Sequence, residues 1–362
     1  MKPLVVDADI RKAETLPTSF YTDLDYFEDS KFKIFEKSWQ WIGDVNSLLS
    51  PLENMSPVDF LTPLIDEPMV VVRNEDNQIK CLSNVCTHRG NVMIHQPTKS
   101  RHILCNYHGR RFELNGAFKS MPEFKEAKDF PRPCDDLHTY NTHSWSNHIF
   151  AGIRPSFSIA DVLKDMNDRV GFLPLDQFKY DAVLSRDYRV RSHWALYCDN
   201  YLEGFHIPFV HQGLNQEIEY ENYETILYDY ANLQIGYTKG QSPSFELPKD
   251  HIDYGKEVAA YYYWLFPNMM FNFYPWGLSV NVVKPLRQDS CKVSFYTYVY
   301  DTQKLNIGAS ADLDKVERED EFVVEGVQRG IQSRFYQSGR FSPTREQGVH
   351  HFHRLIATFM NA

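Results

Sequence analysis

The chain has 362 residues, 43% of them hydrophobic, which is enough for about two domains with buried cores. It carries 38 basic and 48 acidic residues, a formal net charge of −10, and no long basic run. This balance argues against nucleic acid or an anionic membrane as the main partner. The first residues lack the apolar core of a signal peptide, and no stretch approaches about 18 uninterrupted apolar residues, so we expect a cytoplasmic protein with no membrane partner.

The first part of the chain divides into two segments. Residues 1–45 show a helical pattern of apolar side chains and are expected to pack on a later domain; the pattern is formed by Phe32, Ile34, Phe35, Trp39 and Trp41. From residue 46 the pattern changes to short strands separated by polar turns, up to a strand at 148–153. We therefore expect a domain of antiparallel strands over residues 46–155 and a second domain over residues 156–362.

The strand region contains two loops that each pair a cysteine with a histidine. Cys86 and His88 form the first loop, and Cys105 and His108 form the second. Each histidine is followed closely by a glycine, which suits a loop that folds tightly over a cofactor. Two thiolates on one iron and two imidazoles on the other are the ligands of a Rieske [2Fe–2S] cluster. The pattern favours this cluster, with Cys86 and Cys105 on one iron and His88 and His108 on the other.

A tetrahedral zinc site is the alternative for the same four residues. Zinc ligands usually occur as a cysteine pair and a histidine pair, whereas each loop here supplies one of each kind. The other cysteines show no paired spacing and are expected to be buried thiols; they are Cys81, Cys134, Cys198 and Cys291.

In the second domain, an alternating strand at 182–191 precedes a helix whose apolar face extends from Trp194 to Phe205. Pro208 is expected to end this helix, because proline disfavours helical geometry in the preceding residue. His206 and His211 then flank the helix end and can converge on one metal ion. A structural pair of histidines is the simpler alternative.

A non-haem Fe(II) site needs two histidines and one carboxylate on one face, with open positions for O2 and substrate. Residues 316–335 show a helical apolar stripe with Asp320 in its middle, whereas Glu319 and Glu321 fall to either side. A bare buried carboxylate costs several kcal/mol, so Asp320 must bind a metal or pair with an arginine such as Arg329 or Arg345. We favour Asp320 as the third iron ligand.

These motifs together resemble the Rieske non-haem iron oxygenases. The resemblance covers about residues 20–360, and within it the residues around His350 and the Pro267-Asn268 and Pro275-Trp276 pairs are similar to the quaternary-amine branch, whose members are of the choline, betaine and carnitine type. It implies an α+β fold, with an antiparallel β Rieske [2Fe-2S] domain and a helix-grip catalytic domain in which helices cover an antiparallel sheet. It also implies mononuclear Fe(II) on His206, His211 and Asp320.

The same resemblance implies a homotrimer in which the cluster of one subunit serves the iron of its neighbour. Glu203 stands where the wider family usually has aspartate, and it would connect His206 to His108 of the adjacent subunit. The chain has no G-x-G-x-x-G motif after a strand, so electrons must come from a separate NAD(P)H-dependent flavin or iron-sulfur reductase.

Aromatic residues are dense between residues 261 and 276, and aromatic faces attract quaternary ammonium groups. The candidate substrate contacts are Tyr262, Trp264, Phe271 and Trp276. Ordinary packing of sheet strands is an equal explanation for this run. We expect a monooxygenase that hydroxylates or N-demethylates a small quaternary ammonium compound. The alternatives are a Rieske oxygenase for an aromatic or carboxylate substrate, and an electron-transfer Rieske protein without oxygenase activity.

Overall fold

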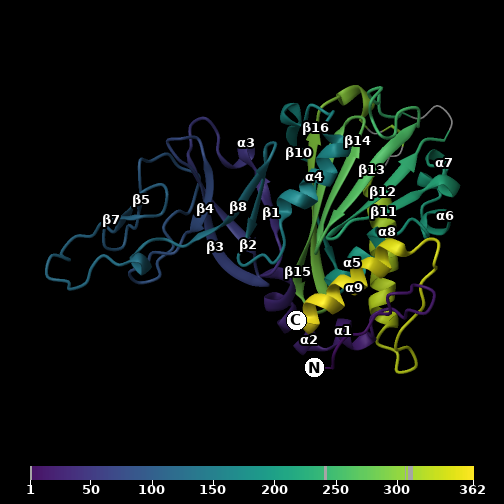
Figure 1. Cartoon of the computed structure of the whole chain (residues 1–362), viewed down its shortest axis with the longest axis horizontal. Coiled ribbons are helices and arrows are strands. Elements are labelled where there is room, and N and C mark those ends of the chain that lie inside the picture. Colours follow the sequence, from purple (N-terminus) through teal and green to yellow (C-terminus); the bar gives the residue numbers. More distant parts are fainter. Residues whose placement is uncertain (1, 240–242, 306, 309–312) are drawn as a thin grey trace. The chain divides into compact units, whose positions relative to one another are not determined.

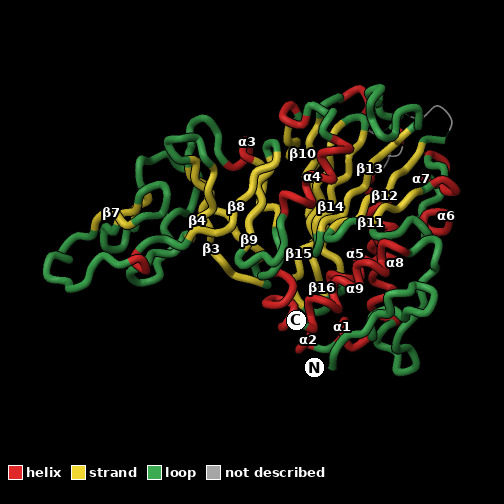
Figure 2. The backbone as a smooth tube through the Cα atoms, in the orientation of Figure 1, coloured by secondary structure: helices red, strands yellow, loops and turns green. Residues whose placement is uncertain are grey.

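The computed structural model describes residues 2–239, 243–305, 307–308 and 313–362. The chain forms two compact units, residues 36–157 and residues 1–35 together with 158–362. Both are built on antiparallel sheets, and helices accompany the sheet of the second unit (Figures 1 and 2). The predicted α+β fold class is therefore confirmed.

The unit of residues 36–157 contains a six-stranded sheet in the order β1-β9-β8-β4-β3-β2 and a small sheet in the order β5-β6-β7. The strands of the large sheet are β1 (Gln40–Asp44), β2 (Met55–Leu61), β3 (Ile65–Arg73), β4 (Ile79–Ser83), β8 (Thr139–Trp145) and β9 (His148–Gly152). The remaining elements are α3 (Val45–Leu48), β5 (Ile103–Leu104), β6 (Arg111–Phe112), β7 (Phe118–Ser120) and a 3-10 turn at Pro133–Asp135. The second cysteine–histidine loop connects β5 to β6 of the small sheet.

The segment 40–44 was expected to be helical, and this expectation is wrong. It forms β1, which pairs antiparallel with β9 and places Trp41 opposite Phe150. The Trp41 indole N–H donates to Nδ1 of His148 at 3.1 Å. Trp39 and Trp41 are two positions apart, which is the spacing of one strand face, but the register shift between Trp41 and Gly43 breaks the alternation after Trp41. The compact unit accordingly begins at residue 36, earlier than the expected boundary at 46.

The other unit is built on a seven-stranded sheet in the order β10-β16-β15-β14-β13-β12-β11. Its strands are β10 (Lys179–Val190), β11 (Glu224–Leu227), β12 (Ala231–Tyr237), β13 (Val258–Leu265), β14 (Met269–Tyr274), β15 (Gly277–Arg287) and β16 (Ser290–Val299). Its longer helices are α4 (Ile159–Val170), α5 (Trp194–Tyr201), α8 (Leu313–Gly330) and α9 (Gln347–Asn361). Short helices are α6 (Ile207–Val210) and α7 (Leu214–Glu217), with 3-10 turns at Leu175–Gln177, Tyr220–Asn222 and Thr302–Lys304. Helix α5 packs on β15, α8 and α9, and α9 also packs on β11.

The N-terminal helices belong to this second unit. They are α1 (Thr18–Thr22), α2 (Leu24–Ser30) and a π-helical turn at Lys31–Phe35. The ring of Phe20 lies 5.2 Å from that of His193, and the ring of Phe35 lies 5.0 Å from that of Trp194. These contacts bury the helices against the start of α5.

The break in helix α5 differs from the expected one. The helix ends at Tyr201 rather than near Pro208, and Pro208 lies in the first turn of α6, where its missing N–H leaves no bond unmade. The chain leaves the helix through Gly204, where a Cβ atom would approach the Tyr223 ring to 2.8 Å. This early exit allows His206 and His211 to stand at the two ends of a separate short helix.

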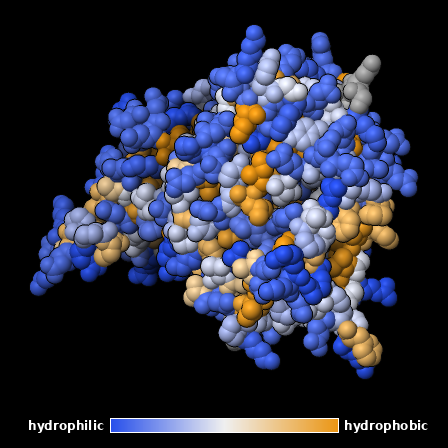
Figure 3. Space-filling model, turned by 45° about the vertical axis from the view of Figure 1, so that its right-hand side comes forward, coloured by the Kyte–Doolittle hydropathy of each residue, from blue (hydrophilic) through white to orange (hydrophobic). Residues whose placement is uncertain are grey.

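Three of the four remaining cysteines are buried as expected, but Cys134 is exposed. The expectation for Cys134 is wrong: in the turn at Pro133–Asp135 the side chain of Asp135 is buried and that of Cys134 is exposed. Hydrophobic side chains reach the face drawn in Figure 3 in several separate groups among hydrophilic ones. None of the helices in the described residues combines the length and apolar character needed to cross a membrane.

Helix α9 contacts the chain just after α5 at Gly348, where an added Cβ would lie 2.3 Å from the carbonyl oxygen of Leu202. We expect Gly348→Ala to lower the free energy of unfolding by about 1–3 kcal/mol, because backbone must move to relieve this overlap. The control is Gly326→Ala in α8, where nothing lies within 4 Å of the new Cβ. That control should gain about 0.5–1 kcal/mol in calorimetric unfolding. Equal unfolding midpoints for the two variants would contradict the proposed contact.

Candidate active site and metal centres

The two cysteine–histidine loops adopt matching conformations. Gly90 N–H donates to Cys86 O at 2.9 Å, and Gly109 N–H donates to Cys105 O at 3.0 Å. Both glycines have positive φ, +70° and +74°, which residues with a side chain rarely adopt. The loops therefore curl around their cysteines in the same way.

The four predicted cluster residues lie together, with the cysteines inside and the histidines outside. Cys86 and Cys105 are each 2% exposed, His88 is half-buried and His108 is exposed. The rings of His88 and His108 lie edge to face with their centres 4.8 Å apart. The Asn91 amide lies 3.7 Å from Cys105 Sγ, a distance suited to a hydrogen bond to sulfur. This donor set fits a Rieske cluster.

Arg110 supports the second loop, and the sequence did not single it out. It is 1% exposed and donates to the Asp135 carboxylate at 2.8 Å and to the Asp135 carbonyl at 3.0 Å. Its guanidinium carbon also lies 5.0–5.5 Å from the ring centres of Phe112, Phe118 and Phe130. An ion pair enclosed by rings fixes the backbone directly after His108 and Gly109.

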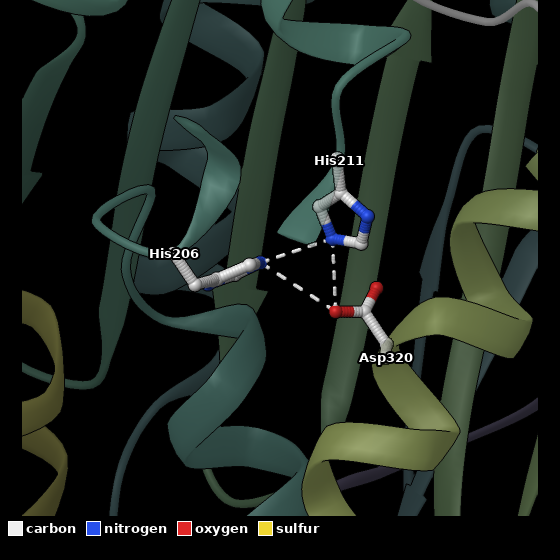
Figure 4. A group of neighbouring side chains, drawn as sticks. All are labelled: His206, His211 and Asp320. Atoms are coloured by element: carbon white, nitrogen blue, oxygen red, sulfur yellow. Dashed lines mark hydrogen bonds and ion pairs between the residues drawn. The ribbon is translucent and has the colours of Figure 1, made fainter. Parts of the chain in front are cut away.

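The other predicted metal residues meet in the second unit. His206 and His211 flank α6, and their Nε2 atoms are 3.2 Å apart. Asp320 from α8 places Oδ1 3.0 Å from Nε2 of His211 and 3.5 Å from Nε2 of His206 (Figure 4). One donor atom from each residue lies within 4.8 Å of the others. The alternative of a salt bridge from Asp320 to Arg329 or Arg345 finds no support, because every ion pair of Asp320 in the described residues is to these histidines.

A carboxylate contacts the outer nitrogen of each histidine. Glu203 Oε1 lies 2.7 Å from Nδ1 of His206, and Glu319 Oε2 lies 2.8 Å from Nδ1 of His211. A carboxylate only accepts, so each Nδ1 must carry the proton and each Nε2 presents a lone pair. Three lone pairs then converge with no proton between them, and a cation fits there. Sequence phase placed Glu319 off the ligand face, and nothing in the sequence indicated its contact with His211.

Burial lowers the pKa of His211, but Asp320 and Glu319 act in the opposite direction and raise it overall. Metal binding must therefore compete with protons at this imidazole.

Helix α8 buries more polar groups than its apolar stripe indicated. Its buried residues are Glu317, Val324 and Gln328, whereas Val327 of the expected stripe is 44% exposed. Gln328 accepts from the backbone N–H of His193 at 2.8 Å. Burial raises the pKa of Glu317 well above its usual range, and the charge of the nearby Asp320 adds to this effect. The hydrogen bond from the Tyr197 hydroxyl acts in the opposite direction but does not outweigh burial.

A cavity of about 120 Å³ lies beside the three candidate metal ligands. Glu203, His206, His211, Glu317 and Asp320 contribute to its wall. Most of the remaining wall is aromatic or amide in character, formed by Tyr197, Asn200, Tyr201, Tyr223, Gln234, Tyr262, Asn272, Tyr274, Asn281 and Phe295. The space is suited to a small molecule with an apolar or cationic body.

Of the four predicted substrate contacts, only Tyr262 lines this cavity. Trp264 packs on Phe352 of α9, with ring centres 5.0 Å apart. Phe271 pairs with Tyr263 in register and so lies on the opposite face of the sheet from Tyr262. Trp276 stacks behind Tyr274 at 5.2 Å. The predictions for Trp264, Phe271 and Trp276 are corrected accordingly, because an unbroken aromatic run does not show which face meets the cavity.

We expect Asp320→Ala to lower the iron content from about three to about two per chain, because it removes a mononuclear ligand while the cluster loops lie in the other unit. The brown colour and the EPR signal of the reduced cluster should remain. Glu319→Gln should keep the ligand but weaken metal binding by about 10–100-fold in a chelator titration. If Glu319→Gln lost the mononuclear iron and Asp320→Ala kept it, Glu319 would be the metal ligand and Asp320 the supporting carboxylate.

The sequence profile of the family described as "Ring hydroxylating alpha subunit (catalytic domain)" matches residues 175–362, and that of the "Rieske [2Fe-2S] domain" matches residues 39–131. Choline monooxygenase of Arabidopsis thaliana is 28% identical over 96% of this chain and 83% of its own length. The carnitine monooxygenase oxygenase subunit of Escherichia coli K12 is 28% identical over 97% of this chain and 95% of its own length.

Solved structures share the fold. The quaternary ammonium Rieske monooxygenase CntA in complex with L-carnitine superposes with a TM-score of 0.77 at 23% identity, over 99% of this chain and 100% of that one. Naphthalene 1,2-dioxygenase from Rhodococcus sp. superposes with a TM-score of 0.73 at 16% identity, over 96% and 94%. A zinc protein is not indicated by any of these similarities. The chain is a Rieske non-haem iron oxygenase of the ring-hydroxylating alpha-subunit family, with a Rieske [2Fe–2S] domain and a mononuclear iron domain.

Proposed function

We propose that this oxygenase uses O2 and electrons from a separate NAD(P)H-dependent reductase to hydroxylate or oxidatively N-demethylate a small quaternary ammonium compound. The observation that carries the proposal is the cavity wall, in which five tyrosines and Phe295 surround the space beside His206, His211 and Asp320. Aromatic faces attract a cation that cannot donate hydrogen bonds, by about 0.5–2 kcal/mol for each ring. Relatives named for choline and carnitine oxidation support the same substrate class.

The assignment of ligands is part of the proposal. Cys86 and Cys105 would hold one iron of the cluster, and His88 and His108 the other; His206, His211 and Asp320 would hold the mononuclear iron. When bound, the cluster supplies single electrons and the mononuclear iron activates O2. The protein contributes orientation: Glu203 and Glu319 fix the histidine tautomers, and the rings orient the substrate and exclude water.

Glu203 is further proposed to connect the two centres across a subunit boundary. Its side chain is 13% exposed, and its second oxygen accepts from the backbone N–H of His206 at 3.1 Å. Two carboxylate oxygens offer about four acceptor positions, so capacity remains for His108 of a neighbouring subunit. A head-to-tail homotrimer would provide that neighbour. Apolar side chains exposed on the elements around the iron site support such an interface: Phe205 is 40%, Phe209 76% and Phe322 81% exposed.

Substrate-dependent O2 uptake with NADH and a suitable reductase tests the function. We expect turnover of at least one of choline, glycine betaine, carnitine and proline betaine, with product formed in proportion to the O2 consumed. Naphthalene should not be oxidised, because it carries no cation for the tyrosine rings to attract and no donor for the amide oxygens of the cavity wall. Oxidation of neutral arenes alone would assign the protein to a different substrate class.

Glu203→Gln tests the connection between subunits, since glutamine keeps the size of the side chain but removes its charge and one acceptor. The variant should keep its cluster and a trimeric sedimentation coefficient, and the reductase should still reduce its cluster. The assay is run with excess Fe(II) so that the mononuclear site is filled, because Glu203 also holds the outer nitrogen of His206 and its loss weakens metal binding. Substrate oxidation should fall by about 100-fold or more, as for other interrupted positioning contacts. Near-normal turnover would show that Glu203 does not connect the two centres. A monomeric wild-type protein would contradict the proposed homotrimer.

A further inference from the structure

Glu317 has a buried carboxyl oxygen that the proposed iron chemistry does not use. It lies on α8 one turn before Asp320, is 4% exposed and lines the cavity. The Tyr197 hydroxyl donates to its Oε2 at 2.6 Å, whereas its Oε1 has no hydrogen-bond partner. A buried carboxyl oxygen without a partner is unfavourable by about 1–3 kcal/mol or more, which identifies a position where a bound molecule completes the structure.

A second acceptor in the same cavity is also unpartnered. Gln234 of β12 is 2% exposed, and its Nε2 donates to the carbonyl oxygen of Tyr201 at 2.7 Å. That bond fixes the orientation of the amide, because a carbonyl oxygen can only accept. Oε1 of Gln234 therefore remains as an acceptor without a partner. Among the described residues that line the cavity, both buried side-chain atoms without partners are acceptor oxygens.

The charge of the cavity points in the same direction. Among the described residues, no lysine or arginine lines the cavity. The residues outside the described ranges include no lysine or arginine either. Glu203 is engaged by His206, and Asp320 lies against both histidines. Glu317 is the cavity carboxyl that these contacts leave available. A substrate carboxylate would meet acceptor oxygens and find no basic side chain to pair with it.

We infer that Glu317 determines the charge of the substrate, so that the cavity selects a cation carrying a hydroxyl group and no carboxylate over a zwitterion. Burial favours the neutral acid in the empty cavity, but a bound cation favours the ionised form, so Glu317 carries its negative charge when the substrate is present. The hydroxyl donates to Oε1 of Glu317, and the cationic head lies against the tyrosine rings of the wall. This inference rests on the proposed quaternary-ammonium function and adds to it a single residue that separates choline-type from betaine-type compounds.

Calorimetric titration of the metal-loaded protein, without O2 and without reductase, tests the inference by binding alone. The ligands are choline, tetramethylammonium, glycine betaine and L-carnitine. Wild-type protein should bind choline at least about tenfold more tightly than either zwitterion, as expected for one charge-assisted hydrogen bond. Tetramethylammonium, which lacks the hydroxyl, should bind more weakly than choline. Glu317→Gln should weaken the binding of tetramethylammonium less than it weakens the binding of choline.

Glu317→Gln should weaken choline binding by about tenfold while glycine betaine binds as well as before or better, since the new amide can donate to a carboxylate. Glu321→Gln is the matched control on the same helix, because Glu321 pairs with Arg318 at 3.1 Å and does not line the cavity. The control should leave all four affinities unchanged.

The outcomes separate the two levels of the proposal. If wild-type protein binds a zwitterion as tightly as choline, the inference about Glu317 is wrong and the quaternary-ammonium function stands. If none of the four ligands binds, the function itself fails. The comparison of choline with the zwitterions uses wild-type protein alone. It therefore tests the inference even if Glu317→Gln does not fold.

Discussion

The catalytic unit depends on the pairing of two histidines, one buried and one half-buried, with two carboxylates. Glu203 and Glu319 hold the protons of His206 and His211 on the outer nitrogens, and this turns both inner nitrogens toward Asp320. Without these contacts either ring could rotate or carry its proton on the inner side. The site is therefore organised for a cation by hydrogen bonds that do not themselves touch the cation.

Backbone geometry makes this pairing possible. Helix α5 ends at Tyr201, the chain passes Gly204 where the Tyr223 ring leaves no room for a side chain, and α6 then separates the two histidines. In a continuous helix, residues five positions apart would point in different directions. A short second helix brings His206 and His211 to one point, and Gly348 of α9 packs closely enough to hold the start of the break in place.

Local signals in the sequence predicted much of this arrangement. The alternating cysteines and histidines of the cluster loops, the two histidines around Pro208 and the helical phase of Asp320 are all short-range patterns. The contacts of Glu319 with His211 and of Glu317 with Tyr197 join residues more than one hundred positions apart, and no periodicity contains them. The strand β1 was missed because a register shift disturbs its alternation. The aromatic run predicted rings near the site, but it could not distinguish Tyr262 from Trp264, whose place depends on α9.

The sheet register has a consequence for how such an enzyme can diversify. Gln234, Tyr262 and Asn272 are paired directly across β12, β13 and β14, so they form one row along the cavity floor. Their neighbours Tyr261, Tyr263 and Phe273 are fully buried on the opposite face. Mutations in the row can reshape the pocket while the residues that stabilise the sheet stay constant. An inherited scaffold can thus acquire new substrates through single codon changes at alternate positions, without repeating the search for a stable fold.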